Sequence, residues 1–102
     1  MFILQKTNHF EDWLNELKDI RAKTKILVRL KRTEIGNLGD YKPVGNGVFE
    51  MKINYGSGYR LYFGRFKGII ILLLLGGDKS TQSKDIQKAK QILSEIGDQY
   101  AY

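Results

Sequence analysis

The sequence predicts a small α+β domain, with two N-terminal helices and one C-terminal helix packed on one face of a twisted, mainly antiparallel sheet. The hydrophobic pattern is helical in the first third of the chain, alternates with a period of two from residue 48, and is helical again after residue 80. A chain of 102 residues has room for one domain, which we expect to span residues 1–102.

The N-terminal segment predicts a short strand followed by a helix. The strand candidate is FILQ, residues 2–5. The helix candidate is residues 8–20, whose apolar residues recur on one helical face: Phe10, Trp13, Leu14 and Leu17. Asn8 and Glu11 have the spacing of a capping pair at its start.

Residues 19–37 predict a second helix that is strongly basic. Its expected apolar stripe is Ile20, Ile26, Leu27 and Leu30. Gly36 is a suitable terminator because glycine readily adopts the left-handed conformation that ends many helices. Six basic residues lie within twelve positions: Arg21, Lys23, Lys25, Arg29, Lys31 and Arg32.

The middle of the chain predicts an antiparallel meander. Residues 38–48, rich in glycine and with the only proline, read as a connection. Residues 48–55 and 59–66 each alternate between apolar and polar positions and are separated by the turn GSG. The run IIILLLL, residues 69–75, is too short to span a bilayer as a helix and suits a strand buried on both faces.

The last segment ends this strand and predicts a C-terminal helix. Its candidate N-caps are Ser80, Thr81 and Ser83. Its expected apolar face consists of Ile86, Ala89, Ile92, Leu93 and Ile96. The three helices and the strands between them complete the predicted fold.

The composition excludes several kinds of chemistry. There is no cysteine, which removes disulfides, thiolate metal ligands and thiol nucleophiles and fits a reducing cytoplasm. The single histidine, His9, rules out mechanisms that need two histidines, and the scattered acidic residues argue against a metal site. The net charge of +6 indicates an anionic partner such as nucleic acid, and the N-terminus lacks the features of a signal peptide.

The remaining candidates are basic and phenolic. If residues 48–55 pair with 59–64 across the glycine turn, one face of the sheet holds Glu50, Lys52, Arg60 and Tyr62. Lys79 follows the next strand, beside a helix N-terminus, where backbone N–H groups favour a phosphate. This constellation predicts a phosphodiester site that uses neither a metal ion nor histidine, in which arginine clamps the phosphate oxygens.

Such a site is chemically sufficient for RNA, because RNA carries its own nucleophile in the 2′-hydroxyl group. A lysine of the cluster and Glu50 are both candidates for the group that takes the 2′-OH proton. The same alternation is typical of a solvated sheet face, and the spacing alone favours a plain surface over a site.

Three stretches together carry a family resemblance: FEDWLNELKD, RLKRTEIGNLGDYKPVGNGVFEMKINYGSGYRLYF and LLLLGGDKSTQSKDIQKAKQIL. In this order they closely resemble the HigB-like addiction module killer proteins of the RelE/ParE toxin superfamily. The resemblance extends from about Phe10 to about Leu93.

The resemblance implies a cytoplasmic toxin of a type II toxin-antitoxin module that cleaves mRNA on the ribosome without a metal ion. It implies two partners, the ribosome with its mRNA and a cognate antitoxin, often a helix-turn-helix protein. The matching catalytic positions are Lys52, Arg60 and Lys79, with Glu50 beside them. The expected RNA contacts are Arg21, Lys25, Arg29, Arg32, Tyr62, Arg65 and Thr81.

Two features keep alternatives open. Some RelE-type toxins carry a tyrosine or histidine near the C-terminus as the proposed base, whereas Tyr100 and Tyr102 in the tail EIGDQYAY fall in no such motif. The superfamily also contains ParE-like gyrase inhibitors. A gyrase-type toxin and an inactive module that only binds an antitoxin are therefore the alternative functions.

Overall fold

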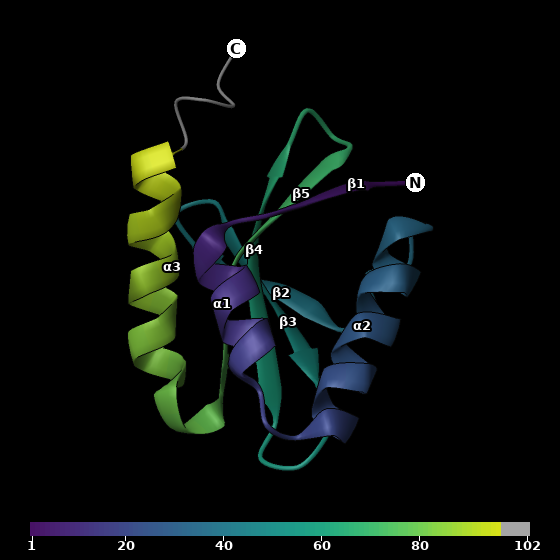
Figure 1. Cartoon of the computed structure of the whole chain (residues 1–102). Helices are drawn as coiled ribbons and strands as arrows, with labels where there is room; N and C mark the ends of the chain where they lie inside the picture. Colours follow the sequence, from purple (N-terminus) through teal and green to yellow (C-terminus); the bar gives the residue numbers. More distant parts are fainter. Residues whose placement is uncertain (97–102) are drawn as a thin grey trace.

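The computed structural model describes residues 1–96 as one α+β unit (Figure 1). Its elements in chain order are β1 Ile3–Lys6, α1 Asn8–Glu16, α2 Ile20–Glu34, β2 Tyr41–Gly45, β3 Val48–Ile53, β4 Tyr59–Phe66, β5 Ile70–Asp78, the 3₁₀ turn η1 Lys79–Thr81, and α3 Gln82–Ile96. The predicted fold class, with two N-terminal helices, a mainly antiparallel sheet and a C-terminal helix, is confirmed.

The five strands form one sheet in the order β1-β5-β4-β3-β2. Strands β2 to β5 pair antiparallel, as the meander predicts, and β1 pairs parallel with β5. The strand β5 is buried along nearly its whole length and lies between β1 and β4. The apolar run therefore forms a central strand, as the sequence predicts.

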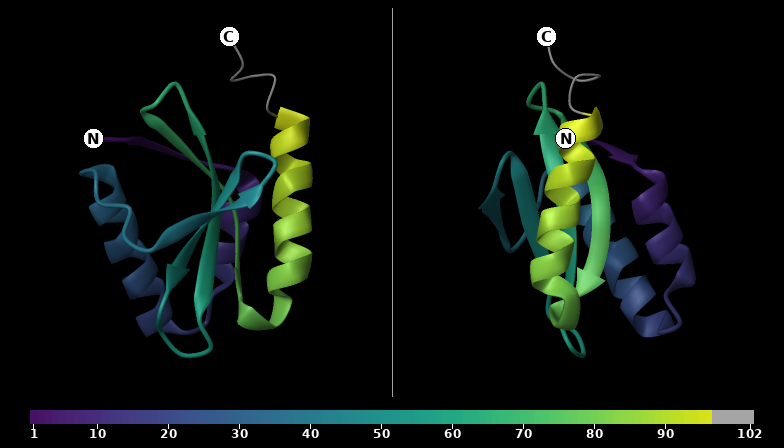
Figure 2. Two further views of the ribbon diagram at one scale, coloured as in Figure 1. Left: turned by 180° about the vertical axis from the view of Figure 1, so that it is seen from behind. Right: turned by 90° about the vertical axis from the view of Figure 1, so that its left-hand side faces the viewer.

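The prediction that all helices pack on one sheet face is wrong. Helices α1 and α2 cover one face, around a core that includes Phe10, Ile26 and Met51. Helix α3 covers the other face, where Ala89 and Ile92 pack against residues such as Tyr62 and Leu74. Figure 2 shows α2 and α3 on opposite sides of the strands. Because β3 and β4 are covered on both sides, alternating polar residues such as those at positions 50 and 60 are buried.

The connection predicted over residues 38–48 contains the strand β2, which the sequence analysis missed. This strand pairs with β3 and lies at the edge of the sheet, where Pro43 is tolerated because an edge strand needs fewer hydrogen bonds. A register shift between Pro43 and Gly45 interrupts the pairing. The proline and the glycines hide the strand from a periodicity search.

Two details of the N-terminal helices also differ from the prediction. The cap of α1 is Thr7 and not Asn8: its Oγ1 accepts from the Phe10 amide at 3.1 Å and donates to the Leu74 carbonyl at 2.7 Å. In α2 the buried residues are Ala22, Ile26, Leu30 and Thr33. Ile20 and Leu27, expected in the core, are exposed. Gly36 follows α2 with φ +105°, as predicted for a terminator.

The end of β5 brings α1 and α3 close to the strands. A Cβ atom at Gly76 would collide with the Trp13 ring, and one at Gly77 would collide with the Asp85 carboxylate. Asp78 then caps the 3₁₀ turn that precedes α3 by accepting from the Ser80 amide at 2.9 Å. Among the helices of residues 1–96, none is long and apolar enough to cross a membrane.

Candidate functional site

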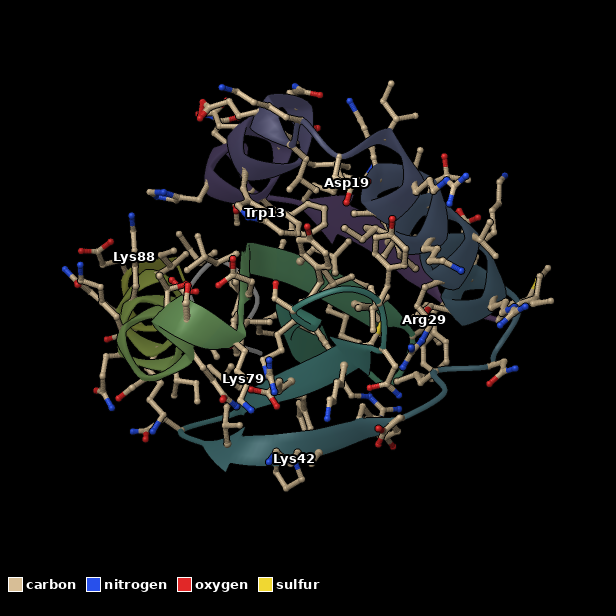
Figure 3. All side chains as sticks on the ribbon, turned by 90° about the horizontal axis from the view of Figure 1, so that it is seen from below. Trp13, Asp19, Arg29, Lys42, Lys79 and Lys88 are labelled. Carbon is tan, nitrogen blue, oxygen red and sulfur yellow. The ribbon has the colours of Figure 1, made fainter. Side chains whose placement is uncertain are left out.

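The predicted cluster gathers around a hollow at one end of the sheet. Lys52, Arg60 and Lys79 line this hollow of about 330 Å³, together with the β3–β4 turn. Lys52 and Arg60 are direct neighbours across β3 and β4. Lys79 joins them because its amide donates to the Gly58 carbonyl of the turn at 3.0 Å. Figure 3 looks at this end of the sheet, with Lys79 near the strands and Lys88 on α3.

Arg60 is the buried member of the cluster. Arg60 is 6 % exposed, and its Nη1 donates a long hydrogen bond of 3.4 Å to the Gly58 carbonyl. Its Nε lies 3.7 Å from Glu50 Oε2 and has no hydrogen-bond partner within residues 1–96. A guanidinium has five N–H donors, so most of those of Arg60 are free to bind an anion in the hollow.

Glu50 lies beneath Arg60 and is 3 % exposed. Its Oε2 accepts from Gln82 Nε2 at 2.9 Å, and its Oε1 lies 4.0 Å from Lys42 Nζ. Both carboxylate oxygens therefore face groups of the protein. This arrangement favours a role in holding Arg60 over a role as an exposed base.

Lys42 and Gln82 were missed by the sequence analysis. Lys42 pairs directly with Glu50 across β2 and β3, so recognition of β2 would have revealed it. Gln82 begins α3, immediately after the GGDKST stretch, and places its amide on the sheet face that was expected to be open to solvent. Lys42, Glu50, Lys52 and Arg60 line a second hollow of about 220 Å³, which shares Lys52 and Arg60 with the first.

Tyr62 lies in the core under α3 with no exposed surface, so it cannot be the direct RNA contact that the sequence predicted. Burial raises the pKa of the Tyr62 hydroxyl well above its ordinary value, and the charges of Glu50 and Asp85 raise it further. Tyr62 is thus a core residue that packs under α3, near the candidate site.

The basic residues of α2 extend the site to one side. Lys25 and Arg32 line a hollow of about 400 Å³ that is also lined by Lys52. Arg21 lies nearer the start of the helix, where it lines another hollow with Tyr55. Lys52 lines both the hollow of Lys25 and Arg32 and the hollow of the predicted catalytic cluster, so Lys25 and Arg32 lie beside that cluster.

Arg29 differs from its neighbours on α2. Its guanidinium donates four hydrogen bonds of 2.8–3.0 Å to three backbone carbonyls, those of Leu38, Asp40 and Lys52. Burial lowers the pKa of Arg29, and the nearby Asp40 charge opposes that shift. Most of its donors are used within the protein, so Arg29 is a structural tie with little donor capacity left for RNA.

The remaining predicted residues lie away from the hollow. Arg65 pairs with Ile71, five residues or about 17 Å along β4 from Arg60, and lies over the Phe2 ring at 5.4 Å. The Thr81 hydroxyl donates to Asp85 Oδ2 at 2.6 Å. Tyr100 and Tyr102 lie outside the described residues. Within residues 1–96, no group of three or more histidine, aspartate or glutamate residues could hold a metal ion.

The comparison with known proteins identifies a relative in Haemophilus influenzae (strain ATCC 51907 / DSM 11121 / KW20 / Rd) that is described as an uncharacterized protein. It is 49 % identical over 94 residues, which cover 92 % of this chain and 95 % of the relative. The chain belongs to the same family as this Haemophilus protein. No known family model matches the chain. Because the Haemophilus relative is matched over nearly its whole length, the similarity concerns the whole domain.

Proposed function

We propose that this protein is the toxin of a type II toxin-antitoxin module of the RelE/HigB type, and that it cleaves mRNA on the ribosome. The proposal rests chiefly on the hollow lined by Lys52, Arg60 and Lys79. Three cations from β3, β4 and η1 suit a phosphodiester, and Arg60 keeps free donors for its oxygens. The sequence resemblance independently supports the same assignment.

The reaction needs positioning and charge stabilisation. The 2′-oxygen of one nucleotide forms a bond to phosphorus, and the bond from phosphorus to the 5′-oxygen breaks, which yields a 2′,3′-cyclic phosphate and a 5′-hydroxyl. Arg60 stabilises the negative charge that develops on the phosphorane oxygens. One of the two lysines takes the 2′-OH proton, and the other gives a proton to the 5′-oxygen.

Of the two kinds of base that the sequence left open, the lysines fit this geometry better. Glu50 is committed to Gln82 and to two cations, whereas Lys52 and Lys79 line the hollow. The basic surface of Lys25 and Arg32 on α2 would hold ribosomal RNA through its phosphates. We also propose a cytoplasmic location and a cognate antitoxin as the second partner.

The test is primer extension on a defined mRNA in a purified translation system. The wild-type protein should produce discrete cuts that require ribosomes, and Lys79→Ala should reduce them by about 10²-fold. The matched control is Lys88→Ala, an exposed lysine on α3 that lines neither site hollow, and it should cut normally.

Other outcomes would contradict the proposal. A wild-type protein that halts growth, leaves transcripts intact and traps gyrase on DNA would be a gyrase-type toxin. A folded protein that is harmless when overproduced would be an antitoxin-binding module. Equal cutting by the Lys79→Ala and Lys88→Ala variants would remove Lys79 from the site.

A further inference from the structure

An aromatic and apolar hollow adjoins the proposed phosphate site. It has a volume of about 560 Å³ and is lined by Ile20, Arg21, Thr24, Lys25 and Tyr55. Tyr55 also lines the hollow that holds Lys52, Arg60 and Lys79. Tyr55 therefore lines both cavities.

The Tyr55 ring is fixed in place from several sides. Tyr59 stacks nearly parallel to it, with ring centroids 6.5 Å apart and an interplanar angle of 19°. The Tyr55 hydroxyl lies 3.5 Å from Asp19 Oδ1, the atom that also caps α2. Tyr55 packs at the margin of the main core. A ring held in this way is a preorganised stacking surface.

Ile20 lines the same hollow as Tyr55 and is unusually exposed for an apolar residue. Ile20 was expected in the core, yet it is 77 % exposed at the start of α2. The charges beside it favour a negative ligand, because Arg21 and Lys25 line the same hollow. A flat, aromatic group attached to a phosphate matches this combination of an aromatic wall, an apolar wall and two cations.

We propose that this hollow holds a nucleobase of single-stranded RNA, stacked on Tyr55 and in contact with Ile20, next to the phosphate bound by Arg60. The proposal rests on the proposed function and adds a base-binding subsite to it. Lys25 lies over the Tyr55 ring, with Nζ 5.4 Å from its centroid. An entering base displaces this flexible side chain, and its ammonium then pairs with a neighbouring phosphate.

The experiment compares two fluorescent RNA decamers of equal charge, one of ordinary nucleotides and one of abasic nucleotides, by anisotropy at low salt. Wild-type protein should bind the ordinary decamer about tenfold more tightly, as expected for base stacking on one aromatic ring. Tyr55→Leu and Ile20→Ser should each lower this ratio toward one. None of these variants changes the charge, so the electrostatic part of binding stays constant.

Two controls isolate the subsite. Tyr55→Phe keeps the ring and should keep the ratio, which separates stacking from loss of the fold. Ile35→Ser changes the same residue type just beyond the other end of α2, where Ile35 is 70 % exposed, and should also keep the ratio.

A wild-type ratio of one, or a ratio that survives both Tyr55→Leu and Ile20→Ser, would overturn the subsite even if mRNA is cut. A tenfold ratio without any mRNA cleavage would overturn the nuclease and leave the subsite standing. Absence of RNA binding would overturn the subsite, and mRNA cleavage in the translation system would still decide the nuclease. A dimer that dissociates in Ile20→Ser would assign the apolar wall to a second copy of the chain and overturn the proposal.

Discussion

Arg29 and Arg60 both lie at strands β3 and β4, but their guanidinium groups differ in the number of hydrogen bonds that they donate within the protein. Arg29 reaches from α2 and donates four hydrogen bonds to three backbone carbonyls. Arg60 lies within β4, is more deeply buried, and donates one long hydrogen bond to a carbonyl. The Arg29 guanidinium has almost no N–H donor left to bind a ligand, whereas Arg60, which lines the hollow, keeps several N–H donors that no hydrogen bond within residues 1–96 uses.

This difference separates a structural role from a binding role better than burial or charge does. A buried cation with few partners is destabilising unless an anion joins it, and the Glu50 carboxylate at 3.7 Å meets only part of that need for Arg60. Arg29 instead ties α2 to β3 and to the loop before β2. Replacement of Arg60 by lysine should therefore reduce mRNA cleavage with little effect on stability, whereas replacement of Arg29 by lysine should reduce stability.

The largest effect is expected for Arg60→Lys. Lysine keeps the positive charge beside Glu50 but cannot clamp two phosphate oxygens with a planar fork. Cleavage of mRNA should fall by roughly 10²–10³-fold, while the free energy of unfolding changes by less than about 1 kcal/mol. Primer extension and urea unfolding on the same preparations measure both. Unimpaired cleavage would place Arg60 outside the chemistry.

For Arg29→Lys the expected effect is a loss of stability. An ammonium group cannot reach three carbonyls at once, so at least two hydrogen bonds from a charged donor are lost. The free energy of unfolding should fall by about 3 kcal/mol. Arg32→Lys, on the exposed surface of the same helix, should change it by less than about 0.5 kcal/mol. Equal stability of the two variants in urea would show that the Arg29 fork contributes little.

The fold could largely be predicted because its helices and most of its strands follow clear periodicities. The apolar residues of α1 and α3, the alternation of β3 and β4, and the central run of β5 are all where the sequence indicates. The strand β2 and the placement of α3 could not be predicted. An edge strand with a proline has weak periodicity, and local sequence does not specify which sheet face a helix covers.

The part of the candidate site that lies on β3, β4 and the end of β5 could be predicted, because those strands have clear periodicities. Pairing across the glycine turn places Lys52 beside Arg60, and the end of β5 places Lys79 nearby. The burial of Arg60 and the bonding of Glu50 depend on α3 covering that face, which the sequence did not indicate. The tie made by Arg29 joins carbonyls that a sequence pattern cannot identify.

Two glycines provide a finer test of the comparison, because each contacts one of the arginines. Gly39 and Gly58 have φ of +67° and +88°, so alanine at either position should destabilise the protein by about 1–2 kcal/mol. At Gly39 a Cβ would also lie 2.8 Å from the Arg29 guanidinium, whereas at Gly58 it would lie 3.4 Å from Arg60 Nη1.

Gly39→Ala should therefore cost about 1–2 kcal/mol more than Gly58→Ala, since it also displaces the Arg29 fork. Urea unfolding of the two variants measures the difference. The reverse order would mean that the Arg60 side is the more tightly packed of the two.

The smallest effect concerns the titration of Tyr62, beneath Arg60. Its pKa is raised by burial first and then by the charges of Glu50 and Asp85, so the native hydroxyl keeps its proton at pH values where the unfolded chain loses it. This contribution to stability is complete below about pH 10, the unfolded pKa, and is lost as pH rises above it.

Between pH 9 and 11 the free energy of unfolding should fall by about 1 kcal/mol more in the wild type than in Tyr62→Phe. All other ionisable groups are the same in both proteins and cancel in the difference. Tyr41→Phe, at an exposed position on β2, should retain the wild-type fall. If Tyr62→Phe lost as much stability as the wild type, Tyr62 would ionise in the native state, and its hydroxyl would be open to solvent.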